Sequence, residues 1–294
     1  MNEALQYAVN AISTGGLYAL LALGLSMTFG IARIVNLAQS ELIMIPCYLI
    51  LATAAWAWPL IIVVALGAAV LLALAMERFA FRPLRGTDET TLLVASFAIS
   101  LGLQSLMTAI VGDKPRGVGF GSGLSSTVTI AGLDISKLDL LTIAITLTLL
   151  ALLALFLRRT PIGVHLRAAA EDFDMAQLLG VRSQRVIMLA FAISGVTAGV
   201  TAIVLTAQQG NLTPTMGVQP LLIGVIAVVV GGMESLTGAV AGGMLLGIVT
   251  VFLSVALPKG LLPFQDALLY MIVIAVLLVR PQGLFIRSSS LERI

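Results

Sequence analysis

Residues 139–207 read DLLTIAITLTLLALLALFLRRTPIGVHLRAAAEDFDMAQLLGVRSQRVIMLAFAISGVTAGVTAIVLTA. Two apolar runs, 139–157 and 186–207, enclose a charged segment at 158–185. A helix needs about 20 apolar residues to cross roughly 30 Å of hydrocarbon, and both runs are of that order. The pattern therefore predicts two membrane-spanning helices joined by a polar connector.

The rest of the chain repeats this pattern. Of the 294 residues, 59% are hydrophobic and 10% are charged, whereas a soluble domain has about 25% charged residues. Backbone groups in lipid must bond within their own segment, so we expect an all-α polytopic membrane protein. Two segments, 42–57 and 218–233, are short for a full crossing and are expected to be tilted, broken or re-entrant. Eight to nine spans follow from the nine hydrophobic segments, which are 9–30, 42–57, 59–76, 91–111, 139–157, 186–207, 218–233, 237–257 and 264–279.

The basic residues predict the orientation. Under the positive-inside rule, the side richer in Lys and Arg is cytoplasmic, which places the N-terminus outside and the C-terminus inside. The poorer side carries Lys114, Arg116, Lys137 and Lys259. Twelve of the sixteen Lys and Arg fall on the richer side, namely Arg33, Arg78, Arg82, Arg85, Arg158, Arg159, Arg167, Arg182, Arg185, Arg280, Arg287 and Arg293.

Other features of the composition exclude some functions. The net charge of +2 does not indicate a nucleic-acid partner. A single cysteine, Cys47, excludes an intrachain disulfide and is expected to be buried filler. With one histidine, His165, and no cluster of carboxylates, we expect no metal site.

The connector contains helix-start and helix-stop signals. Thr160-Pro161 is typical of a helix N-terminus, because proline suits the first turn. The acidic residues Glu171, Asp172 and Asp174 precede an apolar stretch, and Gly180 fits just past a helix end. We therefore predict a short helix at about 170–179 on the cytoplasmic face. From these features alone, a solvated connector between two spans explains the segment equally well.

Polar residues interrupt the apolar pattern at 31–41, IARIVNLAQSE. Asn36, Gln39 and Ser40 are candidates to line a translocation route, because uncharged hydrogen-bonding groups can pass a small zwitterion without trapping it. The alternative is a cytoplasmic turn with ordinary caps, which suits Arg33 and Glu41 at least as well.

Two further patterns concern the spans themselves. Gln104 and Thr108 lie one turn apart on the fourth segment and face the same way, either lining a pore or bonding neighbouring helices. Glycines four residues apart, Gly238–Gly242 and Gly243–Gly247, favour close helix packing. Outside the spans, Thr127–Ile130 is expected to form part of a small hairpin.

Five strings in order resemble permeases of branched-chain amino acid ABC importers, the LivH family. The resemblance extends along nearly the whole chain and implies a single ABC-importer permease domain over 1–294, with a cytoplasmic coupling loop at 158–185. Family members usually show His-Gly where this chain has Gln39-Ser40. The strings are GGLYALLALGLSMTFGIARIVNLAQSE (Gly15–Glu41), ERFAFRPLRG (Glu77–Gly86), TPIGVHLRAAAEDFDMAQLLGV (Thr160–Val181), VVVGGMESLTGAVAGG (Val228–Gly243) and RPQGLF (Arg280–Phe285).

The resemblance also implies partners and a location. The chain would sit in the bacterial inner membrane among lipid, with a second, LivM-like permease or a second copy, two cytoplasmic ABC ATPases and a periplasmic or extracellular solute-binding protein. No G-x-x-x-x-G-K-[ST] string occurs, so ATP and Mg²⁺ belong to the ATPases, and this chain is a non-catalytic subunit that binds no cofactor. Residues expected to dock on an ATPase are Ala169, Ala170, Glu171, Asp172, Ala176, Leu178, Leu179 and Gly180.

The sequence leaves three alternative functions to compare with this one. The same family also includes permeases for urea, amides and other small organic solutes, so the substrate is open beyond leucine, isoleucine or valine. An ion-coupled secondary transporter generally needs a carboxylate or histidine within the membrane, and here the candidates, Glu41, Glu77, Asp139, Glu234 and Asp266, are expected at loops or membrane boundaries. An intramembrane enzyme is disfavoured because no H-E-x-x-H string occurs and His165 lies away from Ser122.

Overall fold

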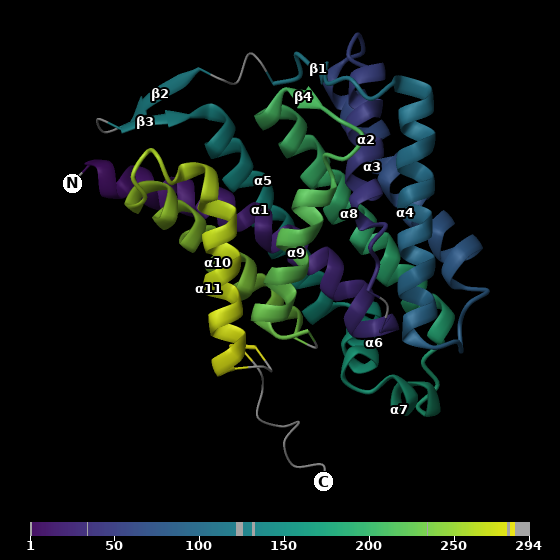
Figure 1. The fold of residues 1–294 in the computed structure, drawn as a ribbon. Coiled ribbons are helices and arrows are strands. Elements are labelled where there is room, and N and C mark those ends of the chain that lie inside the picture. The colour runs from purple at the N-terminus through teal and green to yellow at the C-terminus, as the bar shows by residue number, and fades with distance from the viewer. Residues whose placement is uncertain are drawn as a thin grey trace.

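A computed structural model describes residues 2–33, 35–121, 126–130, 133–233, 235–280 and 283–285. The fold is almost entirely helical (Figure 1), as the sequence predicts. Glu234, Ser122, Arg287 and Arg293, which entered the sequence analysis, lie outside the described residues.

Seven of the helices in this part of the chain are long and apolar enough to cross a membrane. Two more apolar helices are shorter, α2 (Gln39–Ala52) and α9 (Val218–Gly231), and they correspond to the two segments predicted to be short. The seven are α1 (Asn2–Ala32), α3 (Trp58–Ala75) continued by a π-helical stretch (Met76–Phe81), α4 (Glu89–Val111), α5 (Lys137–Arg159), α8 (Ser183–Gln209), α10 (Leu236–Ala256) and α11 (Gln265–Val279), which follows a 3-10 turn (Leu262–Phe264).

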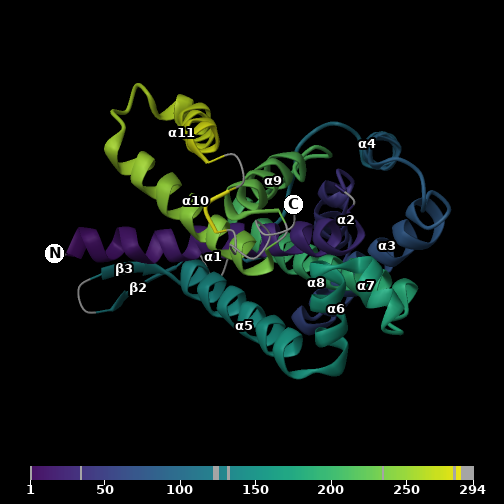
Figure 2. The same cartoon turned by 90° about the horizontal axis from the view of Figure 1, so that it is seen from below.

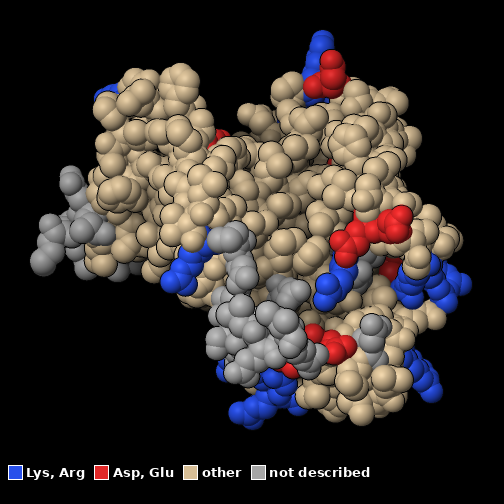
Figure 3. All heavy atoms as spheres, turned by 60° about the horizontal axis from the view of Figure 1, so that its bottom comes forward, with Lys and Arg blue, Asp and Glu red and all other residues tan. Residues whose placement is uncertain are grey.

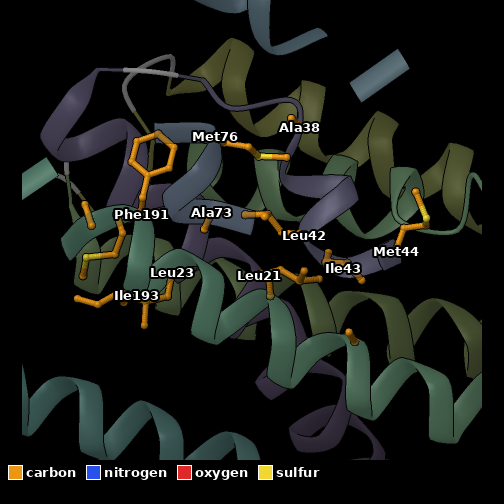
Figure 4. Packing of buried hydrophobic residues seen from close by; sticks show 14 of the residues in the cluster. Leu21, Leu23, Ala38, Leu42, Ile43, Met44, Ala73, Met76, Phe191 and Ile193 are labelled. Atoms are coloured by element: carbon orange, nitrogen blue, oxygen red, sulfur yellow. The ribbon is translucent and has the colours of Figure 1, made fainter. Parts of the chain in front are cut away.

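Helices α1 and α8 form the centre of the bundle. In their most apolar windows, 61% of α1 and 72% of α8 is buried, against 11% for α4 and for α11. Figure 2 shows α1 passing through the middle of the molecule, with α4 and α11 at the periphery. Side chains of α2 share this core: Leu42 and Ile43 belong to the same hydrophobic cluster as Leu21 of α1 and Phe191 of α8 (Figure 4). Cys47 is fully buried there, as predicted.

Glycines bring α1 and α10 into backbone contact, as their spacing predicts. A Cβ atom built on Gly243 would lie 2.5 Å from the Cα of Ala19, and one built on Gly247 would overlap the backbone of Gly15. Real Cβ atoms do not approach other atoms so closely. The crossing of these two helices therefore depends on small residues on both sides.

Two short pairs of strands mark one end of the molecule. Strand β1 (Arg116–Gly117) pairs antiparallel with β4 (Asn211–Leu212), and β2 (Thr127–Ile130) pairs with β3 (Leu133–Ser136), which confirms the predicted hairpin. The β1–β4 pair ties the loop after α4 to the loop after α8. The polar helices α6 (Pro161–Glu171) and α7 (Phe173–Leu178) join α5 to α8 at the opposite end (Figure 1).

Candidate functional site

The polar stretch after α1 runs into the interior of the bundle. Its backbone is bonded to α4, because Leu37 N donates to Ser96 Oγ (3.2 Å) and Ser96 Oγ donates to Val35 O (3.2 Å). One turn further on, Ser40 Oγ lies 3.3 Å from Ser100 Oγ. Since Ser100 is midway along α4, helix α2 begins at mid-depth rather than at a surface. The alternative that the sequence allowed for this stretch, a cytoplasmic turn with ordinary caps, therefore does not form.

A second half-length helix begins at the same place. A Cβ atom on Gly217, the residue before α9, would overlap the carbonyl oxygen of Ser40. From there α2 runs toward the β1 end, where Trp58 stacks on Phe120 with ring centroids 4.7 Å apart. Helix α9 runs the other way, and near its end Leu284 N donates to Val230 O (2.8 Å). We call the meeting point of Ser40 and Gly217 the half-helix junction.

Their lengths explain how two short helices together can cover the thickness of a membrane. At 1.5 Å per residue, 14 residues extend about 21 Å, which is less than the roughly 30 Å of hydrocarbon. Two such helices placed end to end exceed that thickness. Their N-termini, each carrying a partial positive charge of about half an elementary charge, meet inside the protein.

A buried carboxylate occupies the junction. Glu41, in the first turn of α2, has no exposed surface. Its Oε1 atom accepts hydrogen bonds from Ser40 Oγ (2.9 Å), Ser100 Oγ (3.0 Å) and Gln104 Nε2 (2.9 Å). Its Oε2 atom has no partner among the described residues, and neither has the Nδ2 atom of buried Asn36. The expectation that Glu41 lies at a loop or membrane boundary is therefore wrong, because packing against α4 draws this residue into the bundle.

Gln39 connects the same region to the central helix α8. Ser194 Oγ donates to Gln39 Oε1 (2.8 Å), and Gln39 Nε2 donates to the Ser194 carbonyl (3.4 Å). Gly24 of α1 packs against Thr197 Oγ1 and Gln39 Nε2, leaving no room for a side chain. The junction is thus held by three helices and not by a loop alone.

A pocket opens beside this cluster. It has a volume of about 450 Å³ and is lined by Leu101, Gln104, Ser105, Thr108, Ala109 and Thr215. Gln104 links the pocket to Glu41, so it both lines a cavity and bonds neighbouring helices, the two alternatives considered from the sequence. Thr108 is exposed, and its hydroxyl donates to the Gln104 carbonyl (2.9 Å).

The structure thus brings Asn36, Gln39, Ser40 and Gln104 together around the junction, with Thr108 one turn away. Sequence reasoning missed Ser96, Ser100 and Glu41 as members of the cluster. A signal for the two serines was present. One polar residue recurs every four positions along α4, a spacing that places Ser96, Ser100, Gln104 and Thr108 on one helix face.

The connector at the other end of the molecule forms two helices. Thr160 caps α6 by accepting a hydrogen bond from Gly163 N (2.9 Å), and Asp172 caps α7 by accepting one from Met175 N (2.9 Å). Gly180 follows in a left-handed conformation (φ 89°). The start at Thr160 and the stop at Gly180 are confirmed. The short helix predicted at about 170–179 forms as α7, but it begins only at Phe173, because the backbone is extended at Asp172 (φ −152°).

The two helices of the connector have distinct buried and exposed faces. Leu166, Ala169 and Ala176 are buried against the rest of the chain, whereas Leu178 and Leu179 are 82% and 79% exposed. Ala170 is half-buried, and Glu171 and Gly180 are exposed. Of the residues expected to dock, Ala169 and Ala176 therefore have no free surface, and the exposed apolar tip is formed by Leu178 and Leu179.

Basic side chains surround this end of the molecule. Figure 3, which brings the α6–α7 end forward, shows Lys and Arg at several places around it and few across the apolar sides. Lys and Arg concentrated at one end of an apolar helical bundle are typical of a cytoplasmic face.

A helical bundle with seven spanning-length apolar helices and a polar helical connector at one end is a multi-pass membrane protein. Comparison with known proteins identifies which kind. The family described as branched-chain amino acid transport system / permease component matches residues 7–278, and the chain belongs to this family.

Individual relatives agree with this assignment. The chain is 32% identical to the high-affinity branched-chain amino acid transport system permease protein BraD of Pseudomonas aeruginosa, over 97% of this chain and 96% of that protein. It is 31% identical to LivH of Escherichia coli over the same shares. The probable branched-chain amino acid transport permease LivH of Methanocaldococcus jannaschii is 29% identical over 93% of this chain and 90% of that protein. No solved structure gives a significant match.

Proposed function

We propose that this chain is the membrane-spanning permease subunit of an ABC importer for branched-chain amino acids in a bacterial inner membrane. BraD and the two LivH proteins, which match nearly the whole chain, carry names that refer to branched-chain amino acid transport. The whole chain acts as one permease domain, and residues 158–185 form its coupling loop.

The orientation follows from charge and from the half-helices. The α6–α7 end carries Arg158, Arg159, Arg167, Arg182 and Arg185, which makes it the cytoplasmic end under the positive-inside rule. The β1–β4 end is then external. Starting outside with α1 and counting α2 and α9 as segments that begin inside the bundle, the chain finishes with its C-terminus in the cytoplasm.

The observation that carries the proposal is the exposed apolar tip of the connector. Two neighbouring leucines with about four-fifths of their surface exposed are unusual on a polar helical segment, and a hydrophobic contact of this kind suits docking on a soluble subunit. Glu171, exposed at the end of α6, adds a negative charge to the same surface. Ala169 and Ala176 hold the two helices against the chain's own core instead of contacting the partner.

This arrangement transmits movement toward the transmembrane helices. Gly163 packs so closely on the end of α5 that a Cβ atom there would overlap the carbonyl oxygen of Phe156. Leu166, fully buried, belongs to the same hydrophobic cluster as Phe81 and Phe191. A displacement of α6 and α7 is therefore passed to α5 and α8, because close-packed interiors transmit strain.

The remaining parts of the transporter lie on other chains. Two ABC ATPases bind and hydrolyse ATP with Mg²⁺ beneath the α6–α7 end. A second permease, LivM-like or a second copy of this chain, completes the transmembrane pair. An external solute-binding protein delivers the amino acid to the β1–β4 end.

The docking role is tested by charge substitution at Leu179. Leu179→Glu is expected to weaken ATPase binding by about 2 kcal/mol or more, roughly thirtyfold in affinity, because a charge replaces an apolar side chain that docking would bury. The measurement is co-elution of co-expressed ATPase subunits with the purified permease, together with ATP-driven leucine uptake in proteoliposomes.

Leu261→Glu is the matched control, because Leu261 is also exposed (47%) but lies beyond α10, at the external end. It is expected to leave co-elution within about twofold of wild type, since surface substitutions usually have small effects. Normal ATPase binding and uptake by Leu179→Glu would exclude this tip as the docking surface.

A further inference from the structure

We propose that the Glu41 carboxylate is the permease subsite for the ammonium group of the transported amino acid. This inference rests on the proposed function and adds to it the residue that recognises the substrate's positive charge. The ligand of this subsite is an α-amino acid in its zwitterionic form.

The hydrogen bonding of Glu41 is one-sided. All three of its bonds are made by Oε1, and Oε2 is buried without a donor. A buried carboxyl oxygen without a partner is costly in either protonation state, because an ionised oxygen lacks a donor and a protonated one lacks an acceptor. An ammonium group, with three N–H donors and a positive charge, can donate to Oε2 and balance the charge of the carboxylate.

Among the described residues, no Lys, Arg or His side chain forms an ion pair with Glu41. The ion pair that the structure shows for a buried carboxylate joins Arg85 to Glu77, in a different part of the fold. Glu41 has no such pair within the described ranges and is bonded only by serine hydroxyls and an amide. A buried carboxylate without an ion-pair partner is rare and points to a ligand cation.

A complementary group lies on the same polar stretch. The Nδ2 atom of Asn36 is a buried donor without an acceptor, while its Oδ1 accepts from Ala38 N (3.1 Å). An unused acceptor on Glu41 and an unused donor on Asn36 match the ammonium and carboxylate of an amino acid. The positive ends of α2 and α9 also face the junction, so they offset the Glu41 charge and favour the substrate's carboxylate.

Access to Glu41 leads through Gln104. The Gln104 amide covers Oε1 of Glu41 and at the same time lines the 450 Å³ pocket with Thr108 and Thr215. The pocket is open on its outer side, because all of its lining residues except Gln104 are exposed. The buried residues of α4 are Leu92, Ser96 and Ser100, so this helix lies at the edge of the bundle.

The inference is tested first with the isosteric variant Glu41→Gln in the assembled complex. Leucine uptake in proteoliposomes is expected to fall at least about tenfold, because the charge facing the ammonium is lost. ATPase co-elution and ATPase stimulation by the solute-binding protein should remain. The matched control is Glu77→Gln, which removes a second buried carboxylate of the described residues and is expected to keep the KM for leucine within about twofold, since it lies outside the junction.

A second measurement leaves Glu41 intact. The variant Thr108→Cys places a thiol in the pocket, and the native Cys47 is fully buried. Its modification by a thiosulfonate reagent is measured with L-leucine or with 4-methylpentanoate, which has the same carboxylate and side chain but lacks the ammonium group. Leucine is expected to slow the reaction, and 4-methylpentanoate is not.

The outcomes separate the two proposals. Wild-type uptake by Glu41→Gln, or equal protection of the thiol by leucine and 4-methylpentanoate, would overturn the ammonium subsite and leave the importer function standing. Failure of any ATPase to co-elute with the wild-type chain would overturn the importer function itself.

Discussion

Gly217 lies so close to the carbonyl oxygen of Ser40 that a methyl group on its Cα would overlap that oxygen. These two residues belong to the starts of α9 and α2, which leave the junction in opposite directions. A membrane protein can keep helix ends in its interior only where other protein groups bond them. Just before α2, Ser96 Oγ accepts a hydrogen bond from Leu37 N, and Asn36 Oδ1 accepts one from Ala38 N.

Gly217→Ala is expected to destabilise the permease by about 1–3 kcal/mol, the usual cost of overpacking. The backbone at Gly217 (φ −77°) suits any residue, so the effect comes only from the overlap with Ser40. The measurement is thermal unfolding of the purified protein in detergent. Gly102→Ala is the control, because Gly102 lies in α4 with open space around it and alanine favours helices. A melting temperature unchanged by Gly217→Ala would contradict the close contact.

Gly247→Ala is expected to separate α1 from α10, with a similar loss of about 1–3 kcal/mol. The added methyl group meets the backbone of Gly15, which cannot move aside as a flexible side chain would. Unfolding in detergent is compared with that of Gly67→Ala, whose site on α3 has no atom within 4 Å. Equal stability of the two variants would show that α1 and α10 pack less closely than described.

Thr160→Ala is expected to destabilise α6 by about 0.5–2 kcal/mol, because Gly163 N loses its cap. Hydrogen–deuterium exchange over 161–171 should become faster, while exchange in α8 stays the same. Thr160→Ser retains the hydroxyl and should exchange like wild type. Fast exchange in both variants would mean that the methyl group, rather than the cap, holds this helix.

Ser100→Ala is expected to cost about 1 kcal/mol, the usual net value of a hydrogen bond, because Glu41 loses one of its donors. The comparison is Ser105→Ala on the same helix, where the side chain is exposed and stability should not change. Chemical or thermal unfolding of both variants is measured under identical conditions. Equal values would indicate that Ser100 does not bond Glu41 in the folded protein.

Much of the connector was predictable from local signals. The cap at Thr160 and the left-handed Gly180 depend on neighbouring residues, and both formed where predicted. The extended backbone at Asp172 was not foreseen, because an acidic residue before an apolar stretch can lie either inside a helix or at its cap. Asp172 accepts from Met175 N and so became the cap of a new helix.

The burial of Glu41, in contrast, could not be predicted from hydropathy. Hydropathy assigns a charged residue between two apolar runs to a boundary, and this places Glu41 at the surface. The structure buries it because α2 starts beside the midpoint of α4, and the four-residue spacing of Ser96, Ser100 and Gln104 supplies its bonds. One argument against an ion-coupled transporter, the absence of a buried carboxylate, is therefore lost, and the family relationship carries the assignment instead.

The sequence by itself determined that this is a helical membrane protein, where the nine apolar helices of the described residues lie and which two of them are short, and its motifs indicated the family. The helical and membrane properties depend on composition and on periodicity within about 20 residues, because a lipid environment forces each apolar run to satisfy its own backbone. The family follows instead from the ordered motifs along the chain. Only the tertiary structure decided that Ser40 meets Gly217, that Glu41 is buried and that Ala169 and Ala176 face inward. Such burial arises from contacts between segments far apart in the chain. The hydropathy of a single segment does not indicate which other segments pack against it.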